Sequence, residues 1–502
     1  MRTALHRVES DCFKLIYDNE STKEETLELV VPDVCGDIGK ILDTRGQLCL
    51  TSKKASGDEV VICSSAEVSV IYAAEDSGEI LCINAVIPFE QSFTIKGADE
   101  AAGHIAQTCL CGLEAKALNP RKLLIRVEAK TKLRLFAADK FVLWDGIDGC
   151  EAPTNIYLQK KELEHNLIVG IHEKTFTVSD EYSLPNRYTD VKMLSANTEL
   201  CVIDVKSVGN KLVFKANANT IAVFLNKTDN SLFKCELSSQ FSQIIESDAR
   251  GDEHQDTVFT QLKELEFIPL PDRETVSFSV RMNICAQAVC MEEKCSVYVS
   301  DAYSNDYELK TEYEEKQISK LTAKQTVRLS AKGKLCPKGS LNEILYIAPV
   351  FACCEVQGNE ICCTVKTCGV AVVDDGALES LEAELKGRLE LTLPENGRLH
   401  LLSACCDPVV LEQGMELCVD VCVEYCIFQC CEIYAVSSIE LNEEAPKPRE
   451  GCPSLVVLCS HSDMDTWMLA KKYGSTIELI EGANCGDGEF CVSRRPLLIP
   501  KA

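Results

Sequence analysis

Cysteine is the residue type in this chain with the clearest chemical potential, and its thiols crowd into one segment. The 502-residue chain contains 30 cysteines, and thirteen of them lie between residues 305 and 445. In the stretch ELCVDVCVEYCIFQCCEIYAV (416–436), apolar residues alternate with thiols and carboxylates. This period of two predicts a strand that buries its aliphatic side chains. The outer face is then expected to carry Cys418, Cys422, Cys426 and Cys430.

The spacing along this strand limits what its thiols can do alone. Thiols four residues apart on an extended strand are about 13 Å apart, too far for a disulfide or a tetrahedral metal site. Partners must come from neighbouring strands or from another molecule. The candidate cross-linking thiols therefore also include Cys353, Cys354, Cys362, Cys363, Cys405 and Cys406. Three interpretations stay open: inert surface thiols, disulfides within the chain or to other molecules, and a thiolate metal site.

No motif in the sequence points to an enzyme. HExxH, GxSxG and a GxGxxG between a strand and a helix are all missing. CGDIGK (35–40) resembles a phosphate loop only superficially, because Ile41 stands where Ser or Thr is needed. The cysteines form no CxxC pair, and the seven histidines are scattered. We therefore expect a non-enzymatic protein without a cofactor, and we assign no residue as a metal ligand.

The charge and hydropathy of the chain narrow the choice of partner. A net charge of -27 repels phosphate backbones, which argues against nucleic-acid binding. No segment has the roughly 18 apolar residues of a membrane helix. The first residues carry Asp and Glu where a signal peptide has an apolar run. We expect synthesis and initial residence in the cytoplasm.

Self-similarity predicts three repeated β domains. VPDVCGDIGKILDTRGQLCL (31–50) matches LPNRYTDVKMLSANTELCV (184–202) with one gap, and a fainter copy begins at NEILYIAPVF (342–351). In 60–72, apolar and polar residues alternate as in a half-buried strand. The fold class expected is mainly β, with three antiparallel sandwich or barrel-like domains and a small βααβ domain. The expected boundaries are 1–24 for an N-terminal segment, 25–150, 151–304 and 305–441 for the β domains, 442–453 for a linker, and 454–502 for the tail.

The tail contains the only strong helix signals. Asp465 is placed to cap a helix from Thr466 to Tyr473, which Gly474 ends. Ser475-Thr476-Ile477-Glu478 has capping-box spacing and predicts a second helix to about Glu481. The runs LVVLC (455–459) and PLLIP (496–500) predict strands on either side.

The motif DTWMLAKKYGST, Asn484 and the closing PLLIP together resemble a LysM domain. LysM modules usually bind N-acetylglucosamine-containing glycans through two loops. At those loops this chain has Asp463-Met464-Asp465 and Ser493-Arg494-Arg495 instead of the usual residues. We therefore rank protein docking above peptidoglycan binding. The predicted partner-binding surface comprises Asp463, Met464, Asp465, Lys471, Lys472, Ile477, Asn484, Arg494 and Arg495.

Two further motifs extend the resemblance to most of the chain. V-P-D-V-x-x-D-I-x-K-I-L (31–42) and Asn-Pro-Arg-Lys-Leu (119–123), with the repeats and the tail, are similar to the SPOCS-domain family of spore-forming bacteria. The resemblance implies a structural role in spore coat assembly. The tail would dock to the morphogenetic ATPase of the coat or to other coat proteins, and the chain would move from the mother-cell cytoplasm to the forespore surface. The alternatives are a peptidoglycan-binding envelope protein and a self-associating subunit of a cross-linked surface polymer or filament.

Overall fold

The chain folds almost entirely into antiparallel sheets, which confirms the predicted fold class. The computed structural model describes residues 2–101, 103–147, 156–247, 255–271, 275–335, 337, 340–373, 376–411, 416–447, 453–459, 465–484 and 496–502. Among these, every strand pairing is antiparallel. The elements outside the three main groups of strands and the tail are β1 (Arg2–Thr3), which pairs with β19, and a 3₁₀ turn at Ala98–Glu100.

Eighteen strands form three successive units of six, each beginning and ending with a long strand. The first unit has β2 (Leu5–Val30), β3 (Ile38–Ser56), β4 (Glu59–Ala74), β5 (Ile80–Thr94), β6 (Gly103–Asn119) and β7 (Lys122–Ile147). The second has β8 (Ile156–Ser183), β9 (Val191–Val208), β10 (Lys211–Asn226), β11 (Ser231–Glu246), β12 (Thr257–Pro269) and β13 (Ser277–Ser304). The third has β14 (Tyr307–Lys334), β15 (Leu341–Gln357), β16 (Glu360–Val373), β17 (Leu378–Glu390), β18 (Gly397–Leu411) and β19 (Glu416–Pro446).

The strand pairing is the same in all three units. The two long strands pair with each other, the last short strand pairs with the second long strand, and the three middle strands form a meander. The meander is a separate sheet in the first two units, whereas in the third unit β17 also pairs with β14 at one position, Lys332 with Lys386. Even the irregularities repeat, because Ile16, Val169 and Thr322 each stand as an extra, unpaired residue in the first long strand. A bulge inserts one residue at a defined place and bends the strand there. Its recurrence indicates three copies of one structural plan.

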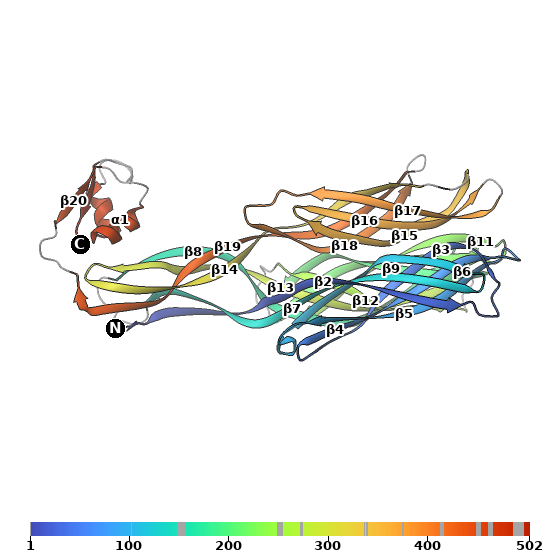
Figure 1. Cartoon of the computed structure of the whole chain (residues 1–502), viewed down its shortest axis with the longest axis horizontal. Coiled ribbons are helices and arrows are strands. Elements are labelled where there is room, and N and C mark those ends of the chain that lie inside the picture. The colour runs from blue at the N-terminus through green and yellow to red at the C-terminus, as the bar shows by residue number, and fades with distance from the viewer. Residues whose placement is uncertain are drawn as a thin grey trace.

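The long strands extend beyond the meanders and form a stalk (Figure 1). We use "stalk" for residues 5–15 and 137–147, 156–168 and 291–304, and 307–321 and 428–446. Its interior is filled by side chains from all three units, namely Leu143, Leu163, Tyr298, Ile318 and Ala435. Residues 5–24, which we expected to lie in a separate N-terminal segment, form most of β2 and are largely exposed. A strand with so little buried surface shows no apolar alternation in its sequence.

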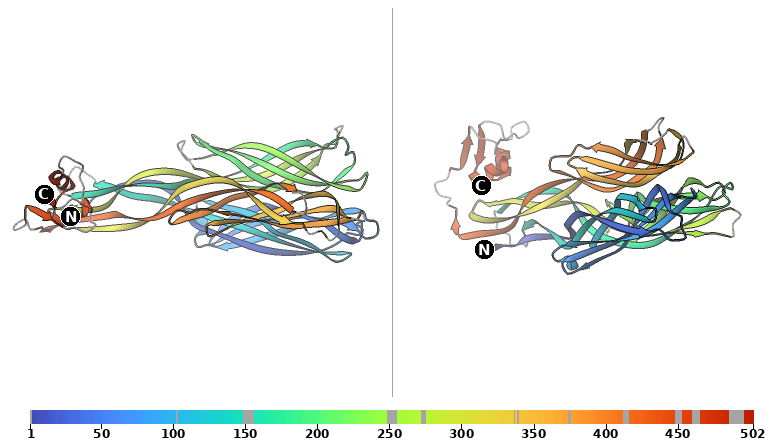
Figure 2. Two further views of the ribbon diagram at one scale, coloured as in Figure 1. Left: turned by 90° about the horizontal axis from the view of Figure 1, so that it is seen from above. Right: turned by 45° about the vertical axis from the view of Figure 1, so that its right-hand side comes forward.

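At the other end the three meanders lie around the long axis of the molecule, as Figure 2 shows. In each meander the first strand contacts the last short strand of the next unit: β3 meets β12, β9 meets β18, and β15 meets β6. The units are therefore arranged as a ring of three. Leu42, Leu194 and Tyr346, from β3, β9 and β15, pack together in one buried cluster where the units meet.

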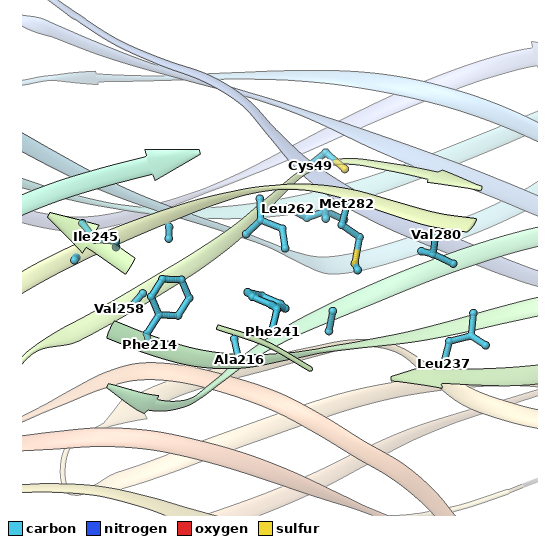
Figure 3. Close-up of a cluster of buried hydrophobic side chains, with 14 of the residues drawn as sticks. Cys49, Phe214, Ala216, Leu237, Phe241, Ile245, Val258, Leu262, Val280 and Met282 are labelled. Atoms are coloured by element: carbon cyan, nitrogen blue, oxygen red, sulfur yellow. The ribbon is translucent and has the colours of Figure 1, made fainter. Parts of the chain in front are cut away.

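The alternation predicted for 60–72 is confirmed in β4. Val60, Ile62, Ala66 and Val68 are buried, while Cys63, Ser65 and Ser69 are partly exposed and Glu67 is exposed. The equivalent strand of the second unit buries Leu212, Phe214, Ala216 and Ala218 in a larger core that also takes in Cys49 of the first unit (Figure 3). The core of one unit is thus completed by a residue of its neighbour.

The tail has the predicted order of strand, helix, helix and strand, in β20 (Leu455–Leu458), α1 (Thr466–Tyr473), α2 (Ile477–Asn484) and β21 (Leu497–Pro500). Asp465 accepts a hydrogen bond from the Met468 amide at 2.7 Å, and Gly474 ends α1 with φ 67°. The second helix differs from the prediction at both ends. Thr476 caps it, through a hydrogen bond from the Leu479 amide at 3.2 Å, and it continues to Asn484. Among the described helices, none is long and apolar enough to span a membrane.

Candidate functional site

The tail is bonded to the tip of the stalk through one face of α1. Trp467 is buried and packs edge-on against Tyr303 of β13, with ring centroids 4.8 Å apart. Its indole Nε1 donates to Asp301 Oδ2 at 2.8 Å, and Lys471 Nζ donates to both Asp301 oxygens at 2.7 and 2.8 Å. Tyr303 and Asn305 then donate to the Ser475 carbonyl at 3.0 and 3.1 Å. The contact therefore joins the C-terminal end of β13 to α1 and to the residue that follows Gly474.

Asp301 is the electrostatic centre of this contact. Partial burial raises the pKa of its carboxyl, but hydrogen bonds from Lys471, Trp467 and Tyr313 outweigh it, so the pKa lies below its usual value. A carboxylate with three such donors stays ionised at neutral pH. Trp467 therefore belongs to the small tail core and to the stalk contact at once.

The predicted partner-binding residues divide between internal and exposed positions. Asp463, Met464, Arg494 and Arg495 lie outside the described residues. Asp465 caps α1, Lys471 pairs with Asp301, and Ile477 packs against the tail core. Asn484 is buried and ties α2 to β21, donating to the Leu498 carbonyl at 2.6 Å and accepting from its amide at 2.8 Å. Lys472 is exposed.

A second face of α1 is exposed to solvent. Its apolar residue, Met468, was not among the predicted partner-binding residues. Met468 is 52 % exposed, and it lies one turn before Lys472 on the same helix face. Trp467 and Lys471, also one turn apart, form the neighbouring face that contacts the stalk. The spacing of the two pairs was visible in the sequence, but which pair faced outward depended on the stalk.

Among the described residues of the cysteine-rich third unit there is one disulfide. Cys354 of β15 and Cys363 of β16 are directly opposite each other in the ladder and are bonded, with Cα atoms 4.1 Å apart. Cys362, Cys418, Cys422 and Cys430 are partly exposed thiols. This fits the expected outer face for the last three.

Cys426 corrects the predicted outer row of β19, because it is buried. It packs with Phe136 of the first unit and Phe259 of the second, beside Leu321. Cys426 pairs with Lys324, two residues after the bulge at Thr322, and the outer face of β19 is covered there by side chains of the two other units. A single-strand pattern does not show that a polar face becomes an interface.

Cys405 and Cys353 lie at interfaces between units, and Cys406 is buried beside Cys405. The Cys353 thiol is in hydrogen-bond contact with Cys109 of β6, and the Cys405 thiol with Cys201 of β9. The hydrogen bond from Cys109, with the charge of Lys130, lowers the pKa of Cys353 to about 7 against the opposing effect of burial. The bond from Cys405 likewise lowers the pKa of Cys201. Sequence reasoning missed Cys109 and Cys201 because they lie hundreds of positions from their partners.

A cavity of about 500 Å³ lies where the three units meet. The cavity is lined by the first strand of each meander (β3, β9 and β15) and by the last short strand of each unit (β6, β12 and β18). Its lining residues include Cys109, Glu199 and Cys405. Burial raises the pKa of Glu199 to about 7, against the hydrogen bond that its carboxylate accepts from the Cys406 amide at 2.7 Å. In the part of the chain that the structure describes, no cluster of His, Cys, Asp or Glu is arranged to hold a metal ion.

These features define an all-β protein of three like units that carries a small helical tail at the tip of its stalk. The family model described as "SipL, SPOCS domain" matches residues 37–109, which cover β3, β4, β5 and the start of β6. The match supports the SPOCS part of the resemblance and indicates a sporulation-associated protein. No curated protein and no solved structure matches the chain.

Proposed function

We propose that this chain is a non-enzymatic structural protein of the bacterial spore coat, and that its LysM-like tail docks it to a coat-assembly partner. The observation that carries the proposal is the SPOCS match in the first unit, on a chain whose tail presents an open helix face at the tip of a stalk. The partner class is the morphogenetic ATPase of the coat or another coat protein. The chain would begin in the mother-cell cytoplasm and end on the forespore surface.

The shape of the molecule suits this role. The stalk separates the tail from the three meanders (Figure 1), so a partner on the tail does not meet the bulky end of the molecule. On α1, the docked face fixes the orientation of the helix, and the open face combines an apolar side chain, Met468, with the cation of Lys472. An apolar anchor beside a positive charge suits a partner groove with an acidic rim.

The partly exposed thiols allow a later step in the same role. Cys362, Cys418 and Cys430 are partly exposed, and Cys431 is exposed on β19. In an oxidising spore envelope, such thiols would form disulfides with other coat proteins or with a second copy of this chain.

The docking proposal is tested with the double variant Met468→Glu, Lys472→Glu in the full chain. The readout is localisation of a fluorescent fusion in sporulating cells. The double variant is expected to stay in the mother-cell cytoplasm, because it removes both the apolar anchor and the cation. Ile203→Glu is the matched control, since Ile203 is also 52 % exposed but lies on β9, and it is expected to localise like the wild type.

Two results would count against docking through this face. Normal forespore localisation of the double variant would exclude it, provided that Trp fluorescence shows the tail still packed around Trp467. Binding of chitin oligomers by the wild-type chain, lost in the double variant, would instead favour a tail that anchors to peptidoglycan.

A further inference from the structure

Two of the three interfaces in the ring of units carry a pair of facing thiols. Cys109 of β6 faces Cys353 of β15, between the first and third units. Cys201 of β9 faces Cys405 of β18, between the second and third units. The two strand contacts are equivalent in the ring. The third unit therefore presents one thiol to each neighbour.

Polar contacts fix the register of the first thiol pair. Lys130 is directly opposite Cys109 in the β6–β7 ladder, and its ammonium group forms an ion pair with Glu355, two residues beyond Cys353. Nearby, Lys366 Nζ of β16 donates to the Leu113 carbonyl of β6 at 3.0 Å. These contacts tie the first unit to the third on either side of the sulfur atoms, so the thiols meet without rearrangement of the backbone.

A backbone hydrogen bond does the same at the second pair. The Cys406 amide donates to Glu199 Oε2 at 2.7 Å. Cys406 is next to Cys405, and Glu199 is two residues before Cys201 on the same strand face. A third thiol, Cys422, lies directly opposite Cys405 in the β18–β19 ladder. Cys405 therefore has one candidate partner in its own unit and another in the next unit.

Each pair combines one activated thiol with one that is held protonated. Hydrogen bonding from Cys109 and the nearby Lys130 lower the pKa of Cys353, while Glu355 opposes the effect. The pKa of Cys109 is raised well above its usual value by Cys353, by burial and by Cys111. In the second pair the pKa of Cys201 is lowered and that of Cys405 is raised. An activated thiol next to a resolving thiol is the arrangement of redox-sensitive sites.

We propose that oxidation closes two disulfides across the unit interfaces, Cys109–Cys353 and Cys201–Cys405, and so staples the third unit to the first and to the second. The staples are internal to one chain and do not depend on the docking partner of the tail. The two staples would also explain two of the thirteen cysteines between residues 305 and 445, namely Cys353 and Cys405.

Hydrogen peroxide is a sufficient oxidant for each staple. The Cys353 thiolate attacks one peroxide oxygen, the O–O bond breaks, and the departing hydroxide takes a proton to leave as water. The resulting sulfenic acid is attacked by the Cys109 sulfur, which loses its proton, and the S–OH bond breaks to release a second water. Two thiols and one peroxide give one disulfide and two waters. Cys109 is exposed to the central cavity, through which a small oxidant reaches the pair.

The test is disulfide mapping of the purified full-length chain. The reduced protein is treated with limiting hydrogen peroxide, quenched with an alkylating agent and digested without reductant for mass spectrometry. We expect peptides linking Cys109 to Cys353 and Cys201 to Cys405 among the first products, in protein that stays monomeric. If Cys109 and Cys353 are still free, and therefore alkylated, after other thiols have oxidised, the first staple is ruled out. A Cys405–Cys422 link in place of Cys405–Cys201 would overturn the second.

A thermal measurement separates stapling from incidental oxidation. Each staple closes a long loop, so oxidation of the wild type is expected to raise the unfolding midpoint by roughly 5 °C or more. Cys109→Ser and Cys405→Ser are each expected to lose part of this rise, while their midpoints in reductant stay close to that of the reduced wild type. Cys49→Ser, at the third interface, is the control and is expected to keep the full rise. An equal rise in all three variants would overturn the proposal even if the links form.

Discussion

The three interfaces of the ring are built on the same strand contacts, yet two hold thiol pairs and one does not. Where β3 meets β12, Cys49 is buried near Leu262 and Met282 (Figure 3). The segment 257–269 contains no cysteine, so Cys49 has no thiol to face on β12. Burial, with the negative charges of Glu67 and Glu264, raises its pKa to about 12.

The difference teaches that surroundings, not residue type, decide what a cysteine does in this protein. Cys49 behaves as a small apolar side chain that fills the core of the neighbouring unit. Cys353 faces another thiol and a lysine, and the lowered pKa makes it a nucleophile at neutral pH. The interface between the first and second units combines packing with hydrogen bonds, such as those from the Thr108 amide to Gln261 Oε1 and from the Ala106 amide to Gln287 Oε1, both at 2.9 Å. The other two interfaces add a chemistry that depends on the oxidant.

The largest effect on stability is expected at the point where all three interfaces meet. Arg45 of β3 is buried and donates to Asp43 at 2.8 Å, to the Cys368 carbonyl at 3.0 Å and to the Pro349 carbonyl at 3.3 Å. Arg45→Met leaves the Asp43 carboxylate buried without its cation, at a cost of about 3–5 kcal/mol in the free energy of unfolding. Denaturant unfolding in reductant measures the change.

The control for this substitution is Arg126→Met. Arg126 forms an exposed ion pair with Glu24 on the surface of the first unit, and its loss is expected to cost less than about 1 kcal/mol. If the two variants lose similar stability, the buried pair does not hold the ring together.

A smaller effect is expected at the interface that lacks a thiol pair, and it should not depend on redox state. Leu262→Ala removes a buried side chain that packs in the same cluster as Cys49, which costs about 2–4 kcal/mol. The loss should be the same with and without reductant, because no disulfide crosses this interface. Cys109→Ser should show the opposite behaviour, with a small cost in reductant and a larger one after oxidation. Thermal unfolding of both variants under both conditions tests the contrast, and a redox-dependent loss for Leu262→Ala would contradict it.

The sequence predicted local features of the fold correctly where the environment of a strand or helix is set by its neighbours in the chain. The alternation in 60–72 predicted the buried face of β4, and Asp465 and Gly474 marked both ends of α1. Both signals come from neighbours in the chain, through the pleat of a strand or the orphan amides of a helix end.

The interfaces were not readable in this way. Cys426 has the spacing of an outer-face residue, but its environment is set by two other units. Lys471 was predicted to lie on the partner-binding surface, but Asp301, 170 positions away in sequence, pairs with it. β2 was divided between two segments because most of its side chains are exposed. The first two misses involve long-range contacts, which no local pattern encodes.

The smallest effect is expected at one of the thiol interfaces, and its size depends on pH. Burial raises the pKa of Glu199 from its ordinary value of 4.5 to about 7. Between these values the folded chain holds a proton that the unfolded chain releases, so the free energy of unfolding falls as pH rises from about 4.5 to about 7. Glu199→Gln removes this titration and is expected to stabilise the reduced protein by about 1–3 kcal/mol at pH 8. At pH 5 the difference should be much smaller. Glu384→Gln, at an exposed carboxylate, should leave the pH dependence unchanged, and an unaltered slope in Glu199→Gln as well would show that Glu199 is not protonated inside the ring.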